Sequence, residues 1–407
     1  LPAASPPLPP NPTLADLTAF RIGGQPGAVI DCHTVDQLIH QIRAADAAGR
    51  RLLVIGGGSN ILAGEQLADL TVLRDRRTGV QMSPAASPTD SETLPTGLTA
   101  ADAPVERLAV SGASPANLTT PRACPGGLAA SEGAPGSLVR VEAQAGALWD
   151  GLVELTVKHG LAGLESLSGI PGAVGAVAVQ NVGAYGTEVG SLIRSATVWD
   201  RQDGAICELS AQDLQFSYRD SILKRSITPD NPTPRWVVLS LVFELRPAAA
   251  GGQVGYQQVA EALETEVGAT APIAAIRQAV LAIRRAKGMV LDQADQDTWS
   301  AGSFFTNPFV TAEVRAGLPA AAPVFAAQGQ TKVSAAWLIE QAGIGPGFKM
   351  NPQARAAVSS KHVLALTNLG GATMGEVMDL AVHIQNQVKA KFNVDLAPEP
   401  VLVNASA

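Results

Sequence analysis

The segment that most restricts how this chain can fold is a glycine-rich stretch from Gly163 to Glu188, GLESLSGIPGAVGAVAVQNVGAYGTE. Apart from its two glutamates the stretch is uncharged, and glycine recurs throughout it. Glycine loses more backbone entropy on folding than other residues, so such a segment usually turns tightly or lets another group approach closely. That group could be a flat phosphorylated cofactor, or the stretch could be a buried loop between domains. A membrane helix is disfavoured, because Pro171, Gln180 and Asn181 interrupt the apolar run.

The composition narrows the class of protein. A chain of 407 residues exceeds the usual size of one domain, so two or three domains are expected. The formal net charge of -7 opposes a general nucleic-acid or anionic membrane surface, although it allows a local basic pocket. The cysteines, Cys32, Cys124 and Cys207, form no CxxC pair and have no histidine at metal-binding spacing. We therefore expect no disulfide scaffold, no metal site, no nucleic-acid or membrane partner, and a reducing, cytoplasmic location.

Changes in composition along the chain predict its domain boundaries. Residues 83–136 are mainly Pro, Ser, Ala, Gly and Thr with weak periodicity, which is typical of a flexible surface insertion. Brief apolar patches within it, such as residues 108–110, could form a marginal hairpin. The N-terminus lacks the basic and apolar regions of a secretion signal. The predicted segments are a Pro-rich tail 1–12, a first subdomain 13–82, the insertion 83–136, a second subdomain 137–246, a linker 247–252, a third domain 253–393 and a C-terminal strand 394–407.

A strand and turn in the first subdomain indicate a phosphate site. Helical periodicity runs from Thr34, an N-cap residue, to Gly49, and the apolar strand 51–55 follows. That strand ends in the motif GGGSN, which consists of Gly56, Gly57, Gly58, Ser59 and Asn60. Successive glycines can present backbone N–H groups to a phosphate, and the serine and asparagine could add side-chain hydrogen bonds. The alternative is a plain tight turn, since the motif is neither GxGxxG nor a Walker loop.

The other periodic segments predict further elements. Residues 70–73 and 80–82 are expected to be strands that close the first subdomain. The turn Gln202-Asp203-Gly204 between apolar runs indicates a hairpin, and Thr373 with Glu376 forms a capping box that begins a helix. The remaining expected strands are 138–143, 196–200, 205–209, 236–245 and 363–367, and the expected helices are 147–159, 257–267, 272–288, 332–343 and 373–388.

Four motifs occur in a fixed order along the chain, namely GGGSN (56–60), SGIPGAVGAVAVQNVGAYG (168–186), YRDS (218–221) and AGSFFTNP (301–308). Together they resemble the UDP-N-acetylenolpyruvoylglucosamine reductases, flavoenzymes that complete UDP-N-acetylmuramate for bacterial cell walls. The resemblance covers nearly the whole chain except 1–12 and 83–136. It implies an α+β fold with the two FAD-binding subdomains shared with vanillyl-alcohol oxidase, followed by a substrate-binding domain. The tyrosines resemble those of the subtype with a longer tyrosine-bearing loop.

The resemblance also implies a reaction and its ligands. NADPH would reduce bound FAD, and the flavin would then reduce UDP-N-acetylglucosamine enolpyruvate to UDP-N-acetylmuramate. In the family, NADPH and the sugar nucleotide use one pocket in turn, so no separate Rossmann domain is expected. We expect a monomer. Two other functions stay open, which are a different flavin oxidoreductase of the same fold and a catalytically inactive flavin or nucleotide-sugar binding protein.

Three catalytic residues follow from the resemblance. Ser303 matches the proton donor, Arg219 matches the arginine that grips the enolpyruvyl carboxylate, and Glu399 matches a C-terminal glutamate that supports the arginine and the reacting carbons. A guanidinium offers a planar, bidentate and permanently charged grip that lysine cannot copy. Without the resemblance, Ser303 would be read as a turn serine and Arg219 as a partner of Asp220. Asp395 is the rival of Glu399.

The C-terminus departs from the family pattern. The family usually has Glu-Val-Arg where this chain has Glu399-Pro400-Val401. Pro400 favours an extended conformation at Glu399 and removes one ladder hydrogen bond.

The resemblance assigns two further sets of residues. The expected substrate contacts are Tyr185, Tyr218, Tyr256, Lys287, Asn307 and His362, with an ordinary structural histidine as the alternative for His362. The expected cofactor contacts are Gly56, Gly57, Gly58, Ser59, Asn60, Gly175, Gln180, Asn181, Gly183 and Arg284.

Overall fold

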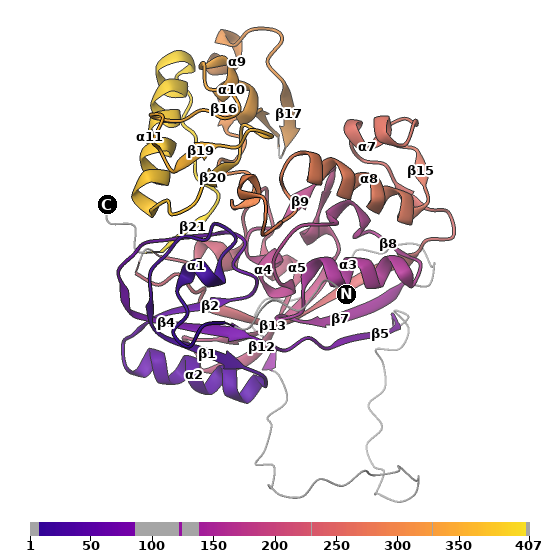
Figure 1. Cartoon of the computed structure of the whole chain (residues 1–407). Coiled ribbons are helices and arrows are strands. Elements are labelled where there is room, and N and C mark those ends of the chain that lie inside the picture. The colour runs from indigo at the N-terminus through magenta and orange to yellow at the C-terminus, as the bar shows by residue number, and fades with distance from the viewer. Residues whose placement is uncertain (1–7, 86–121, 124–137, 229, 328, 404–407) are drawn as a thin grey trace, which may run out of the picture.

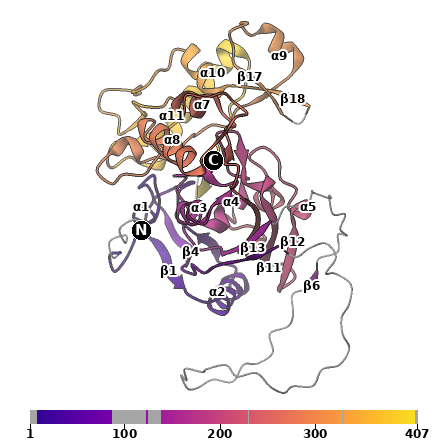
Figure 2. The same ribbon diagram turned by 90° about the vertical axis from the view of Figure 1, so that its right-hand side faces the viewer.

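The computed structural model describes residues 8–85, 122–123, 138–228, 230–327 and 329–403. The hairpin predicted at 108–110, most of the predicted insertion and the first part of the Pro-rich tail lie outside these residues. Figure 1 shows the N-terminal two sheets in indigo to magenta, with the C-terminal elements in orange and yellow standing over them. Figure 2 gives the same arrangement from the side.

The first sheet is small and parallel. Its strand order is β1 (Pro26–Cys32), β4 (Leu67–Asp75) and β2 (Arg51–Ile55). Helix α2 (Val35–Ala47) buries Leu38 and Ile42, and Thr34 caps it by accepting a hydrogen bond from the Gln37 N–H, as predicted. The short helix α1 (Leu14–Leu17) and strand β3 (Ile61–Ala63) complete this part. The turn after β2 lies against the glycine-rich stretch, where Gly57 meets Gly172.

The second sheet is larger and mostly antiparallel. Its order is β5 (Val80–Pro84), β7 (Val139–Gln144), β13 (Trp236–Pro247), β11 (Ile193–Asp200), β12 (Ala205–Ser210) and β6 (Arg122–Ala123), with β8 (Leu161–Ala162) also on β13. The prediction that residues 80–82 close the first subdomain is wrong. Strand β5 instead pairs with β7, Val80 opposite Ala143, because Val80 and Met82 pack against the core of this second sheet. The hairpin of β11 and β12 is as predicted.

The glycine-rich stretch is neither a single loop nor a single helix. It contains η2 (Glu165–Leu167), α4 (Val174–Val179), β9 (Gly183–Ala184) and β10 (Thr187–Glu188). Helix α3 (Trp149–Lys158) precedes it, and η3 (Val189–Ser191), α5 (Ala211–Leu214) and α6 (Ile222–Arg225) follow. Across the described part of the chain, every helix is too short or too polar to cross a membrane.

The C-terminal part joins several small sheets to five described α-helices, of which α8 and α11 are the longest. The first half contains β14 (Gly252–Gln253), α7 (Gln257–Ala262), β15 (Thr270–Ala271), α8 (Ile273–Ala286) and η4 (Gln296–Thr298). The second half contains β16 (Phe309–Val310), α9 (Ala312–Gly317), β17 (Val324–Ala327), β18 (Gln330–Val333), α10 (Ala335–Gln341), β19 (Ala356–Val358), β20 (Leu366–Asn368) and α11 (Met374–Phe392). The capping box that begins α11 is as predicted.

Three helix or strand boundaries predicted in this part differ from the structure. The helix expected from residue 332 begins only at Ala335, because residues 330–333 pair with β17 as strand β18. Helix α7 ends at Ala262, five residues before the predicted 267. The strand expected at 363–367 lies at 366–368, where it pairs with β19. In each case a cross-strand partner or a turn, which local periodicity does not report, sets the boundary.

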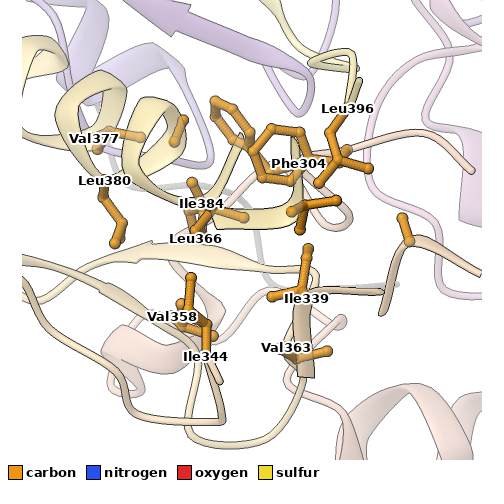
Figure 3. Close-up of a cluster of buried hydrophobic side chains, with 14 of the residues drawn as sticks. Phe304, Ile339, Ile344, Val358, Val363, Leu366, Val377, Leu380, Ile384 and Leu396 are labelled. Carbon is orange, nitrogen blue, oxygen red and sulfur yellow. The ribbon is translucent and has the colours of Figure 1, made fainter. Parts of the chain in front are cut away.

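One hydrophobic core crosses the predicted domain boundaries. Figure 3 shows Val377, Leu380 and Ile384 of α11 gathered with Phe304 and Leu366. The same cluster includes Phe20, Ile22 and Leu62 from the N-terminal part. Strand β21 (Val401–Val403) also pairs in parallel with β3, Val401 opposite Ile61. The C-terminal part is therefore joined to the N-terminal part by a shared core and by the strand pair of β21 and β3, and Glu399 lies just before β21.

Candidate functional site

A large cavity lies between strand β2 of the first sheet, the glycine-rich stretch and the C-terminal part, with a volume of about 860 Å³. This is within the range of small-molecule and cofactor sites. All four sequence motifs contribute to its wall. The predicted residues that line it are Gly56, Gly58, Ser59, Asn60, Gln180, Gly183, Tyr185, Tyr218, Arg219, Tyr256, Arg284, Lys287, Ser303, Asn307, His362 and Glu399. The predicted residues that do not line it are Gly57, Gly175 and Asn181.

Two glycine loops meet at one end of the cavity. A Cβ atom added to Gly56 would lie 2.4 Å from the Cβ of Ala173, and one added to Gly57 would lie 2.7 Å from the Cα of Gly172. Gly58 has a φ of +60°, and an added Cβ would lie 2.0 Å from the Leu17 carbonyl oxygen. Side chains at Gly56 and Gly57 are therefore excluded because the two loops touch one another, and at Gly58 because α1 lies against the turn, so part of the glycine signal reports packing.

The same end of the cavity has the chemistry that a flavin dinucleotide needs. Ser59 and Asn60 supply polar groups beside the touching loops, while β2 and α4 supply apolar wall residues that include Ile55, Ala176 and Val177. The apolar wall suits a flat ring system, and the polar groups suit a pyrophosphate. The residues present therefore fit FAD.

Gly175 and Asn181 have structural roles beneath the cavity wall. A Cβ on Gly175 would lie 2.7 Å from that of Ala145, so α4 lies directly against the second sheet. Asn181 is buried, and its Nδ2 donates to Glu188 Oε2 and to the Ser217 carbonyl, both at 2.9 Å. Its Oδ1 accepts from the Gly190 N–H at 2.8 Å. Asn181 thus ties the glycine-rich stretch to the loop that carries YRDS.

Arg219 and Glu399 form the charged centre of the site. Arg219 Nε lies 3.1 Å from Glu399 Oε1, but its N–H is not aligned for a hydrogen bond to that or any other described group. The terminal Nη2 of Arg219 donates to the Gly183 carbonyl at 2.7 Å. We therefore treat the pair as a charge contact that leaves hydrogen-bonding capacity on the guanidinium. The predicted alternative partner, Asp220, pairs with Arg225 instead.

Glu399 is held by a short chain of amide side chains. Gln180 Nε2 donates to Glu399 Oε1 at 3.2 Å, and Asn60 Nδ2 donates to Gln180 Oε1 at 2.7 Å. Burial raises the pKa of Glu399, an effect opposed by the positive charges of Arg219 and Lys224. Asp395, the sequence rival, is exposed and pairs with Lys389.

Pro400 leaves the backbone hydrogen bonds of its two neighbours intact. The Glu399 N–H donates to the Phe304 carbonyl at 2.8 Å, and the Val401 N–H donates to the Asn60 carbonyl at 2.9 Å. The hydrogen bonds on either side of the proline are therefore made, and the departure from the family pattern leaves Glu399 anchored to two separate segments.

Ser303 is placed by the aromatic residues that follow it. Phe304 and Phe305 are buried, and Phe304 enters the core drawn in Figure 3. The Phe304 N–H donates to the Leu364 carbonyl at 2.7 Å, while Ser303 forms a bridge with Ala365. Gly302, with a φ of +72°, makes the turn that precedes the serine. The segment is thus fixed from behind while Ser303 lines the cavity.

A second group of residues forms the other end of the cavity. The rings of Tyr185 and Tyr256 meet edge to face at 5.6 Å between centroids, and Lys287 Nζ lies 6.0 Å from the Tyr185 ring. Lys287 donates to Gln258 Oε1 at 2.6 Å. Arg284 Nη2 donates to the Met289 carbonyl at 2.9 Å, and its buried Nε has no partner among the described residues.

Burial and mutual repulsion shape the charges at this end. Burial lowers the pKa of Lys287, and nearby Arg284 lowers it further. Burial also lowers the pKa of His362 to about 4, with Lys287 and Arg284 as added causes. His362 is therefore a neutral imidazole at pH 7, able to both donate and accept a hydrogen bond.

Helix α8, which carries Arg284 and ends just before Lys287, is tied to the glycine-rich stretch. Arg277 on α8 donates to both carboxylate oxygens of Asp150 on α3, at 2.6 and 2.9 Å. Asp150 Oδ1 also accepts from the Gly169 N–H at 2.6 Å. One carboxylate thus sets the position of α8 relative to the loop that lines the cavity.

Two lysines in the cavity wall were not predicted. Lys332 Nζ lies 3.4 Å from the centroid of the Tyr218 ring, and the Tyr218 hydroxyl accepts from the Asn307 N–H at 3.2 Å. Lys224 Nζ donates to the Arg219 carbonyl at 2.9 Å. Lys224 could have been sought as the first cation after YRDS, whereas Lys332 had no signal because strand β18 was read as helix.

Comparison with known proteins gives consistent matches. Family models match an FAD binding domain over residues 137–210 and the C-terminal domain of UDP-N-acetylenolpyruvoylglucosamine reductase over residues 293–403. The chain is 40% identical over 404 residues to UDP-N-acetylenolpyruvoylglucosamine reductase of Saccharopolyspora erythraea, covering 97% of this chain and 95% of that protein. It is 40% identical over 399 residues to the Nocardia farcinica protein of the same name, covering 96% and 88%.

A solved structure shows the same fold. The crystal structure of UDP-N-acetylenolpyruvylglucosamine reductase from Thermus caldophilus matches with a TM-score of 0.54 and 20% identity, over 96% of this chain and 97% of that one. With the FAD binding domain match, this confirms the expected α+β fold with an FAD-binding domain.

Proposed function

Because this chain belongs to the UDP-N-acetylenolpyruvoylglucosamine reductase family, we propose that it reduces UDP-N-acetylglucosamine enolpyruvate to UDP-N-acetylmuramate with NADPH. Family membership, which the four motifs predicted, makes it an FAD-dependent oxidoreductase of peptidoglycan precursor synthesis. The observation that carries the proposal is that Ser303, Arg219 and Glu399, from three distant segments, line one cavity beside the glycine loops. We also propose that the enzyme is a cytoplasmic monomer with three domains, the first of which ends before β5.

Arg219 holds the carboxylate of the enolpyruvyl group in this proposal. Its guanidinium is permanently charged, lines the cavity and has an Nε–H without a hydrogen-bond partner among the described residues. Negative charge grows on the substrate carboxylate and adjacent carbon during reduction. Donors fixed in place before the reaction stabilise such charge most effectively. Glu399 keeps Arg219 in position through their 3.1 Å charge contact, and burial raises the pKa of Glu399 against the opposing charge of Arg219.

Ser303 supplies the proton in this proposal. FAD, when bound, supplies the hydride that reaches one alkene carbon, so the neighbouring carbon needs a proton. A hydroxyl is a weak acid, but the enol-like species that forms is a much stronger base than water. The buried Phe304 and Phe305 fix the backbone of Ser303, so the serine is already in position when substrate binds.

The far end of the cavity holds the phosphates of both nucleotides in turn. Lys287 and Arg284 are partly or fully desolvated cations that bond to neutral groups, so an anionic ligand improves their environment. Tyr185, Tyr256, Tyr218 and Asn307 supply hydrogen bonds and aromatic surface for the sugar and nucleoside. The loops at 56–60 and 169–173, with Gln180 and Gly183, would hold FAD.

An absorption spectrum tests the proposal. Purified protein, reconstituted with FAD, should lose its flavin absorbance on anaerobic addition of NADPH. It should regain that absorbance, still without oxygen, on addition of UDP-N-acetylglucosamine enolpyruvate. Recovery with oxygen alone would favour a different flavin oxidoreductase of this fold. Failure to bind FAD would favour the inactive nucleotide-sugar binding protein.

A further inference from the structure

Arg219 occupies a backbone position that normally belongs to glycine. Ser217 and Asp220 pair through two backbone hydrogen bonds of 3.1 Å, so Tyr218 and Arg219 form the two central residues of a tight turn. Arg219 has a φ of +55°. A side chain other than glycine at the second central position of a turn with positive φ is disfavoured by its Cβ atom. Something must therefore hold this arginine in its conformation.

Lys224 makes the contact that holds the turn. Its ammonium donates to the Arg219 carbonyl oxygen at 2.9 Å, and it lines the same cavity as the arginine. This carbonyl belongs to the residue with the left-handed conformation, so the contact fixes the peptide plane that follows it. The guanidinium at the other end of Arg219 then reaches the Gly183 carbonyl and Glu399.

The base of Lys224 is itself rigid. It lies on the four-residue helix α6, which Ser221 caps by accepting a hydrogen bond from the Lys224 N–H at 3.2 Å. The buried Ser221 hydroxyl donates to the Val179 carbonyl, at the end of α4, at 2.5 Å. The lysine is thus attached to the glycine-rich stretch rather than to a mobile surface.

We propose that Lys224 is a positioning residue for Arg219, which locks the strained turn so that the guanidinium faces the carboxylate of the substrate. The inference rests on the proposed function for the identity of that carboxylate. It assigns Lys224 to the half of the reaction that involves the enolpyruvyl group. Reduction of the flavin by NADPH involves no such carboxylate and should not depend on it.

The test compares the two half-reactions in the FAD-loaded enzyme by anaerobic stopped flow. Lys224→Met should slow reoxidation by UDP-N-acetylglucosamine enolpyruvate by about 100-fold, the order expected for a misplaced catalytic group. Reduction by NADPH should change by less than about twofold, and Lys224→Arg should restore most of the reoxidation rate because it keeps a donor at this point. Lys158→Met, at an exposed ion pair on α3, is the matched control and should leave both rates unchanged.

A binding measurement tests the inference without turnover. Lys224→Met should weaken the affinity for UDP-N-acetylmuramate, which carries the carboxylate, by about 10-fold relative to UDP-N-acetylglucosamine, which lacks it. Unchanged reoxidation and an unchanged affinity ratio would overturn the inference. So would an equal loss in both half-reactions with a lower unfolding temperature, which would give Lys224 a general structural role. If the wild-type enzyme itself is not reoxidised by the enolpyruvyl substrate, the proposed function fails, and the affinity ratio still decides the role of Lys224.

Discussion

The two ends of the cavity carry positive charge in different ways. At one end, Arg219 lies 3.1 Å from the buried Glu399, and Gln180 and Asn60 extend the network. At the other end, Lys287 and Arg284 donate to Gln258 and a backbone carbonyl, and neither forms an ion pair among the described residues. The first end has its counter-charge in place before a ligand arrives, whereas the second gains its counter-charge from the ligand.

This difference predicts that one end acts mainly in the chemical step and the other mainly in ligand binding. A prearranged network stabilises charge that develops during reaction, which is expected to appear in kcat. Cations without a counter-ion stabilise charge already present on the ligand, which is expected to appear in KM. Substitutions at the two ends should therefore affect different kinetic constants.

Ser303→Ala should have the largest effect. Removal of the proton donor should slow reoxidation by the enolpyruvyl substrate by about 1000-fold, within the usual range for general acid catalysis. Reduction of the flavin by NADPH should be unchanged, because that step needs no proton from the protein at this carbon. Stopped-flow absorbance measures both steps in one sample. Reoxidation at the wild-type rate would remove Ser303 from the mechanism.

The residues at this end that were predicted from the four motifs line one cavity, and their catalytic roles stay predictions. Ser303 follows a small residue and precedes two phenylalanines, and the structure buries those rings while the serine lines the cavity. Glu399 was predicted despite Pro400, and both neighbouring N–H groups are bonded. The caps of α2 and α11 were likewise predicted, since a cap depends only on residues within one turn.

The sequence did not predict features that depend on contacts between distant segments. Strand β5 has the same local pattern whether it joins the first or the second sheet, and only its pairing with β7 decides the matter. Gly57 looked like a phosphate ligand but meets Gly172 of another loop. Lys332 became visible only when the antiparallel pairing of β18 placed it over Tyr218.

Arg219→Lys should have the second largest effect. Lysine keeps the charge but loses the planar fork and the reach to the Gly183 carbonyl, and the left-handed backbone stays strained. We expect reoxidation to slow by about 100-fold, similar to the loss of one donor to a developing negative charge. The KM for NADPH should change little. A comparable loss in NADPH reduction would contradict the separation of the two ends.

His362, at the second end of the cavity, should make the free energy of unfolding depend on pH. Its folded pKa of about 4 lies below the usual 6.5, so the unfolded chain binds the proton first as the pH falls. The contribution of the neutral His362 side chain to the free energy of unfolding is therefore fully present above about pH 6.5 and is lost as the pH decreases toward 4. After allowance for the water-accessible part of the ring, the loss should be about 2 kcal/mol. Denaturant titrations from pH 7 to 4 measure it.

A matched pair of variants isolates this contribution. His362→Gln keeps hydrogen-bonding capacity but cannot take up the proton, so the stability of this variant should fall less steeply between pH 6.5 and 4. His159→Gln, at an exposed position after α3, should leave the slope of the wild type unchanged. Identical slopes in all three proteins would mean that the imidazole is not desolvated as the cavity geometry implies.

Lys287→Gln should have the smallest effect and the most specific one. The ammonium is half-buried beside Tyr185, and its present acceptor is the neutral Gln258 side chain. If both nucleotides place a diphosphate here in turn, the substitution removes the same contact from each of them. The KM for NADPH and the KM for the sugar nucleotide should therefore each rise by about 10-fold, the value of one charge-assisted hydrogen bond.

The control for this prediction lies two residues away on the same helix. Arg285 is exposed and does not line the cavity, so Arg285→Gln removes an equal charge without touching the ligand. With kcat unchanged in both variants, a rise in both KM values for Lys287→Gln alone would show that one cation serves two ligands. A rise for only one nucleotide would instead mean that the two ligands place their phosphates at different points. The second end of the cavity would then be two partly overlapping subsites, and the contrast with the Arg219 end would hold for only one of the ligands.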